Sequence, residues 1–330
     1  MEQKKQAAGA ENIYRLDGRV PLQKAIPFGL QHVLAMFVAN LAPVLIVCSA
    51  VVIRGTGEHL NPAEITGLLQ CAMFTAGLGT CMQLYPVWKI GSKLPIVMGI
   101  SFTFVGSLLT IGTNPALGYE GMVGAVILGG IFEGLVGLSA RYWKRFLTPV
   151  VSACVVIAIG LSLLSVGMDS WGGGTGAGDF GAWYHLLVGG FTLVVCLVAN
   201  YRLKGIYKNL NILIGLIFGY LLSVILASLF PPLGAFFNSL PQAVLGGCTV
   251  MMFGSIMYEG IKMLKECEFD DRTMIIVSLA FCIGVGLTQT SGNFFAAFPP
   301  AVGEVFNGNA VAGVFVVALF LSLVLPKRKD

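Results

Sequence analysis

The chain has 330 residues, of which 56% are hydrophobic and only 11% are charged, with a formal net charge of +4 and a mean hydropathy of +0.84. A soluble domain usually carries about 25% charged residues, so the composition excludes an ordinary soluble globular protein and indicates one embedded in a membrane. The 43 glycines suit the close approach of helices in lipid.

The first apolar run, residues 27–53, contains no Asp, Glu, Lys or Arg and is long enough to cross a hydrocarbon core of roughly 30 Å. His32, Asn40 and Pro43 interrupt it. Because polar groups in lipid are costly unless they face a protein interior or a cavity, we expect this helix both to span the membrane and to line a cavity. The polar residues 1–26 predict a cytoplasmic tail, not a cleavable signal.

Ten apolar runs are predicted to be membrane helices. They are 29–53, 65–86, 94–112, 119–139, 147–168, 183–200, 209–230, 243–261, 273–290 and 308–326. If the N-terminus lies in the cytoplasm, a ten-span topology places every Lys and Arg except Arg54 on the cytoplasmic side. Positive residues are retained inside, so the pattern predicts a multi-pass protein of the cell membrane with both termini in the cytoplasm.

The third run is unusual for a passive helix. It contains Pro95, Gly99, Ser101, Thr103 and Gly106 in close succession. Irregular backbone at membrane depth survives only where protein or a wet cavity satisfies the freed polar groups, and broken helices of this kind bind substrates in secondary transporters. A flexible, packed helix is the alternative reading.

Several segments resemble the nucleobase–ascorbate transporter family, the uracil–xanthine permeases. PFGLQHVLAMFVANLAPVLIV resembles the first helix of that family, GISFTFVGSLLTIG its third helix and TPVVSACVVIAIGLSLLSVGM its fifth. VLGGCTVMMFGSIMYEGIKML and the C-terminal run are similar to its twelfth to fourteenth helices. The resemblance covers nearly all of residues 20–326 and is most specific to bacterial xanthine and purine permeases.

The resemblance implies an all-α polytopic membrane protein, a shortened form of a fold with fourteen helices in two inverted repeats, divided into a core and a gate domain. The implied division is a cytoplasmic tail (1–26), a core-domain half with helices 1–4 (27–140), gate-domain helices (141–230), an outside loop (231–242), further gate-domain helices (243–326) and a cytoplasmic tail (327–330).

The chain lacks a counterpart of the family's eighth to eleventh helices. KGIYKNLNILIGLIFGYLLSVILASLF resembles the end of the seventh helix, and LGAFFNSLPQAVLGG follows at once and resembles the approach to the twelfth. We therefore expect a junction near 230–234, with Pro231 and Pro232 in an outside loop. In the family the absent helices form the second half of the core and carry the glutamate and the tenth-helix segment that hold the base.

Five residues match positions that contact or approach the base in the family. Ser101 and Phe102 match the broken third helix, which offers a backbone amide and an aromatic ring to a flat base. Ala39 matches a position where a small side chain lets the base approach, and Phe253 matches a gate position facing it. His32 matches a first-helix histidine whose role is mainly structural, so both packing and substrate contact stay open for it.

Two carboxylates lie furthest inside apolar runs, Glu133 and Glu259. An ionisable group in a membrane span is a functional candidate by default, so they are possible proton-linked groups. Both lie near cytoplasmic ends and match no coupling residue of the family, which favours a structural role. Glu120, Asp169 and Asp179 are expected to be solvated.

The resemblance implies coupled uptake of a purine base, xanthine or urate, with H⁺ or Na⁺ as the coupling ion and no cofactor. The missing helices predict that this chain is impaired in transport; a non-transporting membrane remnant and a uracil permease are the alternatives. Expected partners are a nucleobase, the lipid bilayer and a second copy in a homodimer, without nucleic acid. His32, His59 and His185 have no metal-site spacing, and we expect neither a metal site nor an enzyme.

Overall fold

The computed structural model describes residues 21–87, 90–94, 96–174, 178–203, 210–229, 240–290, 293–295, 298–306 and 309–326. These residues form helices and two isolated bridges, without an extended strand. The helices are α2 (Leu22–Ala50), α3 (Pro62–Leu84), α4 (Val105–Gly112), α5 (Gly118–Leu138), α6 (Ala140–Trp143), α7 (Pro149–Ser162), α8 (Leu164–Trp171), α9 (Trp183–Arg202), α10 (Asn211–Leu229), α11 (Leu240–Lys265), α12 (Asp271–Gln289), α13 (Pro300–Phe306) and α14 (Ala310–Val324). The predicted all-α fold is confirmed.

Each of the ten predicted apolar runs contains an apolar helix of the described chain. Six helical segments are long and apolar enough to cross a membrane: α3, α5, α7 with α8, α9, α11 and α12. Shorter apolar helices lie within the other four runs: Asn40–Ala50, Phe102–Gly112, Asn211–Leu226 and Ala310–Val324. The protein is therefore a multi-pass membrane protein.

Local sequence explains where several helices begin. Asn61 and Glu64 form a capping box at the start of α3, with Pro62 at the first helical position. The Asp270 side chain accepts a hydrogen bond from the Thr273 backbone N–H and caps α12, and Asn309 caps α14 in the same way. Such caps satisfy backbone donors that the first turn of a helix leaves free.

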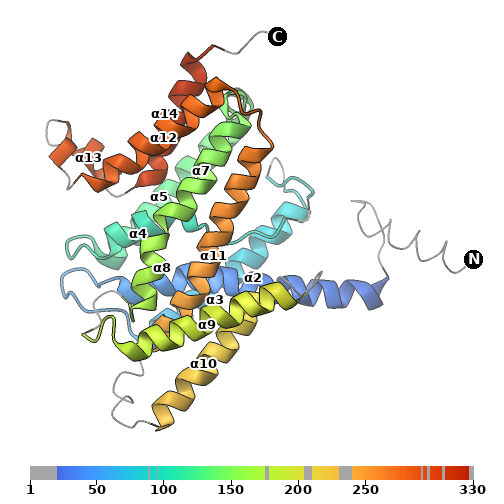
Figure 1. Cartoon of the computed structure of the whole chain (residues 1–330), viewed down its shortest axis with the longest axis vertical. Coiled ribbons are helices and arrows are strands. Elements are labelled where there is room, and N and C mark those ends of the chain that lie inside the picture. Colours follow the sequence, from blue (N-terminus) through green and yellow to red (C-terminus); the bar gives the residue numbers. More distant parts are fainter. Residues whose placement is uncertain are drawn as a thin grey trace, which may run out of the picture.

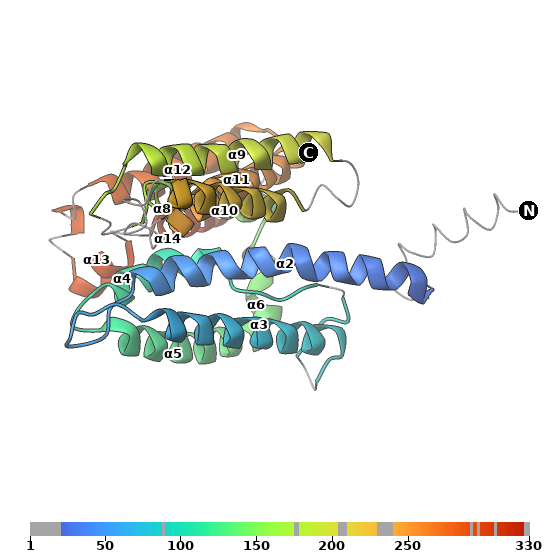
Figure 2. The ribbon, with the colours of Figure 1, turned by 90° about the horizontal axis from the view of Figure 1, so that it is seen from below.

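The helices form two layers, which Figure 1 shows face on and Figure 2 shows edge on. The first layer contains α2, α3, α4 and α5, and the second contains α8 to α12 and α14. α7 packs against α11 and α14 and belongs to the second layer. Buried residues of α7, α12 and α14 form the largest apolar cluster of the second layer. The assignment of 27–140 to a core domain, and of 141–230 and 243–326 to a gate domain, stays a prediction.

The two layers meet in one buried apolar cluster. Ile46 and Val47 of α2 and Val105 of α4 pack there with Leu163 and with Phe253 of α11. α2 also contacts α10. The expected junction at 230–234, with Pro231 and Pro232, lies outside the described residues.

Candidate functional site

The third apolar run is broken where the sequence predicted a break. Residues 96–101 are not helical, and a short 3₁₀ helix at Phe102–Phe104 leads into α4. Ser101 has extended backbone angles, and its Oγ accepts a hydrogen bond from the Thr103 backbone N–H at 3.3 Å. Only the second half of this run, Phe102–Gly112, is therefore helical.

Side chains of two neighbouring helices satisfy part of the non-helical backbone. The N–H of Met98 donates to Oγ1 of Thr80 in α3 at 3.0 Å, and the N–H of Ile100 donates to Oδ1 of Asn40 in α2 at 3.0 Å. Asn40 is buried. A Cβ at Gly99 would collide with the Asn40 carboxamide, so the close approach of the two segments requires glycine there.

Phe102 and Phe253 lie in contact across the two layers. Their ring centroids are 5.4 Å apart, and the ring planes meet at 82°, an edge-to-face arrangement that aromatic pairs prefer. Phe253 is fully buried and Phe102 is half-buried. The structure thus brings together two of the predicted site residues, next to Ser101 at the break.

The other predicted site residues lie on α2, α5 and α11. His32 and Ala39 are on α2, and Ala39 directly precedes Asn40; their side chains lie outside the described part. Glu133 is exposed on α5 and has no ion pair among the described residues. Glu259 on α11 pairs with Lys262, with 3.6 Å between Oε2 and Nζ.

The expectation that Asp179 is solvated is wrong. Its Oδ2 accepts a hydrogen bond from the Tyr184 hydroxyl and lies 2.9 Å from Nε2 of His185, a residue with no exposed surface. Partial burial raises the pKa of the Asp179 carboxyl, but the hydrogen bonds from Tyr184 and His185 outweigh this effect, and the pKa lies below its usual value.

Of the other two carboxylates expected to be solvated, one is exposed and the other is half-buried. Glu120 is exposed, and its Oε2 accepts from the backbone N–H of Arg54 at 3.1 Å. Asp169 is half-buried within α8 and does not lie in a loop. No group of three His, Cys, Asp or Glu side chains in the described chain is placed to hold a metal ion.

Sequence reasoning missed Asn40 and Thr80 as supports of the break. Asn40 carried a signal, because a carboxamide in the middle of a charge-free span needs a polar partner. Thr80 carried none: a threonine in an apolar helix usually bonds to the preceding turn. Its hydroxyl does so here, donating to the carbonyl of Ala76 at 2.8 Å, while its oxygen also accepts from Met98.

Comparison with known proteins identifies related chains. A family model described as "Permease family", for xanthine and uracil permeases, matches residues 23–228 and 224–293. "Putative purine permease" of Clostridium perfringens is 34% identical over 432 positions, covering 96% of this chain and 93% of the relative. Xanthine permease XanP of Escherichia coli is 24% identical, covering 98% and 97%. Xanthine permease XanQ of the same species is 34% identical over 66% of this chain and 48% of the relative.

These alignments confirm the predicted internal shortening. The alignment with the Clostridium protein covers nearly all of both chains and has 432 positions. This number exceeds the 330 residues of the chain. The relative therefore carries an internal stretch without a counterpart in this chain. The two family matches meet at residues 224–228, a few residues before the predicted junction.

Proposed function

Because the chain belongs to the xanthine/uracil permease family, we propose that its function is that of a nucleobase permease, the uptake of a purine base, xanthine or urate, coupled to H⁺ or Na⁺, and that this shortened chain is impaired in it. The observation that supports this proposal most is the broken third run, where Ser101 and Phe102 meet Phe253 of the opposite layer. The names of relatives, xanthine permease and purine permease, point to the same substrate class.

The chemistry of a nucleobase matches this arrangement. A base has a π face and a hydrogen-bonding edge, so a ring and a set of free backbone amides recognise it together. The N–H groups of Gly99 and Ser101 have no hydrogen-bond partner among the described residues and supply donors for the edge. The ring of Phe102 supplies the stacking surface once it has moved out of its edge-to-face contact with the ring of Phe253. By the family resemblance, Ala39 of α2 leaves room for the base to approach, and His32 of α2 either contacts the base or packs the helices together.

The same proposal includes impaired transport by this shortened chain. The segment missing after residues 224–228 would supply the second wall of the site. A buried amide-like group without its partner costs about 1–3 kcal/mol, so two or three lost bonds lower the affinity for the base by several orders of magnitude.

We propose that the chain forms a homodimer and that it uses no cofactor besides the coupling ion. A membrane remnant without transport activity is the second candidate, favoured by the missing segment.

Uptake by liposomes tests this function. The chain is compared with a chimera in which the internal stretch of the Clostridium relative is inserted at residues 224–228. We expect gradient-driven, saturable uptake of labelled xanthine by the chimera under an inward H⁺ or Na⁺ gradient, and none by the chain itself. Urate and uracil as competitors distinguish a purine from a uracil permease. A chimera inactive toward all three bases would contradict the assignment, and robust uptake by the chain would contradict the impairment.

Labelling of single cysteines tests the proposed orientation, with both termini in the cytoplasm. In a variant without other reactive cysteines, an impermeant thiol reagent added to intact cells should modify a cysteine at Glu58, which is exposed between α2 and α3, but not one at Asp271, the first residue of α12. The reverse labelling pattern would invert the topology.

A further inference from the structure

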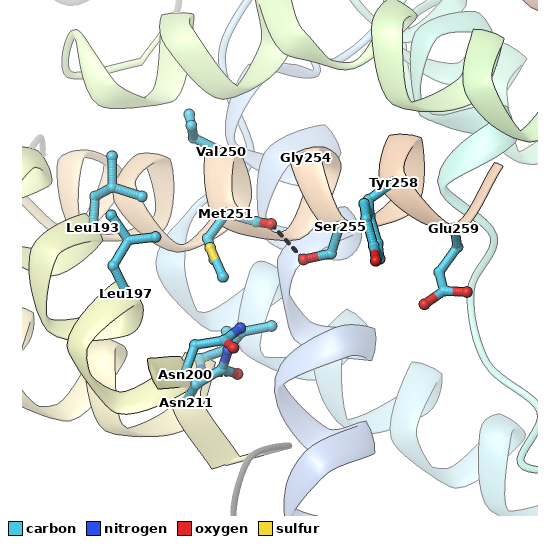
Figure 3. A pocket seen from close by; sticks show the side chains of 11 residues that line it. Leu193, Leu197, Asn200, Asn211, Val250, Met251, Gly254, Ser255, Tyr258 and Glu259 are labelled. Atoms are coloured by element: carbon cyan, nitrogen blue, oxygen red, sulfur yellow. Dashed lines mark hydrogen bonds between the residues drawn. The ribbon is translucent and has the colours of Figure 1, made fainter. Parts of the chain in front are cut away.

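A cavity of about 910 Å³ opens between α9, α10 and α11, away from the Phe102–Phe253 contact. Phe253 lies on the face of α11 that packs into the interlayer cluster, whereas Met251, Ser255 and Tyr258 line the cavity from the opposite face. Figure 3 shows the side chains of Met251, Tyr258 and Glu259 on the side of α11 that faces Asn200 and Asn211. The cavity is thus separate from the proposed base site.

The cavity changes from apolar to polar along α11. Val250 and Met251 line it at one end, and Tyr258 and Glu259 line it two turns further on, near the C-terminal end of the helix. Ser255 lies between the two pairs, where its hydroxyl donates to the Met251 carbonyl at 2.9 Å. One wall of the cavity therefore has an apolar half and a polar half.

The other two helices repeat this gradient in the same direction. On α9, Leu193 and Leu197 line the cavity before Asn200, which precedes the helix end by two residues. On α10, which runs the opposite way, the polar lining residue is the first residue of the helix, Asn211. The side chain of Asn200 has no hydrogen-bond partner among the described residues. The polar lining residues thus belong to the C-terminal parts of α9 and α11 and to the first residue of α10.

Basic residues lie at this polar end. Lys262 follows Tyr258 by one turn on α11, and Arg202 ends α9. The Lys262 ammonium pairs with Glu259 at 3.6 Å, but both side chains are more than half exposed, with fractions of 57% and 61%. An ion pair this exposed contributes about 0–1 kcal/mol, so another anion can replace Glu259 as the partner of Lys262.

We propose that this cavity binds an anionic phospholipid of the cytoplasmic leaflet. One acyl chain lies along Leu193, Leu197 and Met251, and the phosphate pairs with Lys262 at the mouth, where Asn200 and Tyr258 provide hydrogen-bond donors. In the orientation proposed above, the basic ends of α9 and α11 lie at the cytoplasmic side of the membrane. The leaflet on that side is enriched in anionic lipids. A flat base would use the polar end alone and leave the apolar half without a ligand.

Lipid titration of the purified, delipidated protein tests this site. Native mass spectrometry measures binding of phosphatidylglycerol and of phosphatidylcholine with identical acyl chains. The protein should prefer phosphatidylglycerol, and Lys262→Gln should lower its affinity roughly fivefold, the value for one basic residue near an anionic headgroup, with little change for phosphatidylcholine. Lys144→Gln is the matched control, because Lys144 is exposed in the turn between α6 and α7.

A cavity-filling variant tests the acyl-chain half independently. A Cβ at Gly254 meets no atom within 4 Å, and the same is true at Gly286 on α12, which does not line the cavity. Gly254→Leu should lower the affinity for both lipids at least roughly tenfold by occupying the apolar space, and Gly286→Leu should change neither. An unchanged lipid preference in Lys262→Gln, unchanged binding in Gly254→Leu, or displacement of bound lipid by xanthine would each overturn the proposal.

Discussion

The two layers differ sharply in how much of their helices the protein itself covers. In the second layer, the buried share of the membrane-spanning windows is 22% in α12, 39% in α9 and 50% both in α7 with α8 and in α11. In the first layer the corresponding windows of α3 and α5 are 0% and 6% buried. Both layers have similarly apolar sequences, so composition does not explain the contrast. It teaches that α3, which packs against α2, and α5, which packs against α4, each leave most of their surface uncovered by the described residues.

The comparison with relatives points to what would cover this surface. The alignments show an internal stretch in the relatives that this chain lacks, and the sequence resemblance assigns this stretch to the second half of the core domain. We propose that this stretch would cover the uncovered faces of α3 and α5.

The largest expected effect is the loss of stability when a larger side chain replaces a glycine in one layer or the other. A Cβ at Gly284 of α12 would collide with the backbone of Val314 in α14, whereas a Cβ at Gly124 of α5 meets nothing within 4 Å. Gly284→Leu should destabilise the protein by about 3 kcal/mol or more through overpacking, and Gly124→Leu should be nearly neutral. Apparent melting temperatures in one detergent measure both variants. Equal losses would mean that α5 is packed after all.

The next effect concerns Asn40 of α2, a buried polar side chain that supports the break. Asn40→Leu removes the acceptor of the Ile100 N–H and leaves a buried donor unpaired, at a cost of about 1–3 kcal/mol. Asn114→Leu is the control, since Asn114 accepts from Ala116 in an exposed turn where water can replace it. The same thermal assay distinguishes them. A stable Asn40→Leu protein would contradict the described support.

A smaller effect is expected where the layers touch. Phe102→Leu, Phe253→Leu and the double variant form a double-mutant cycle, and the edge-to-face pair should give a coupling of about 0.5–1.5 kcal/mol. The cycle is measured by chemical unfolding in detergent. Strictly additive losses would show that the two rings do not contact each other in solution.

The smallest effect is a pH dependence within the second layer. The pKa of Asp179 in the folded protein lies below its usual value, which is about 3.9 in an unfolded chain. The stabilisation from this carboxylate is therefore complete above the unfolded pKa and disappears as the pH falls through the folded pKa. Asp179→Asn should flatten the melting temperature between about pH 5 and pH 3 relative to the parent chain. An unchanged slope would contradict the role of the Tyr184 and His185 hydrogen bonds.

Hydropathy predicted most of the fold because each membrane helix must satisfy its own backbone and present apolar side chains to lipid. The break at residues 96–101 was predictable for the same reason, since Pro95, Gly99 and Ser101 disfavour a continuous helix. The internal shortening was recognisable because two adjacent segments resemble the seventh helix of the family and the approach to its twelfth, which are not consecutive in the longer pattern.

Contacts between distant segments were not predictable from one sequence. The hydrogen bond from Ile100 to Asn40 joins residues 60 positions apart, and neither residue indicates the other. Asp179 looked solvated because it follows a glycine-rich stretch, yet the beginning of α9 brings the buried His185 against it. The roles of His32, Ala39, Glu133 and Glu259 in transport stay predictions.

The most direct test of the uncovered faces of α3 and α5 is the accessibility of spin labels to lipid-soluble oxygen in nanodiscs. Labels are placed at Phe132 on α5, which is 69% exposed, and at Phe320 on α14, which is 61% exposed. Both labels should be accessible in the chain itself. Insertion of the relative's internal stretch should protect Phe132 and leave Phe320 accessible. Protection of Phe132 already in the shortened chain, or unchanged accessibility in the chimera, would contradict the account.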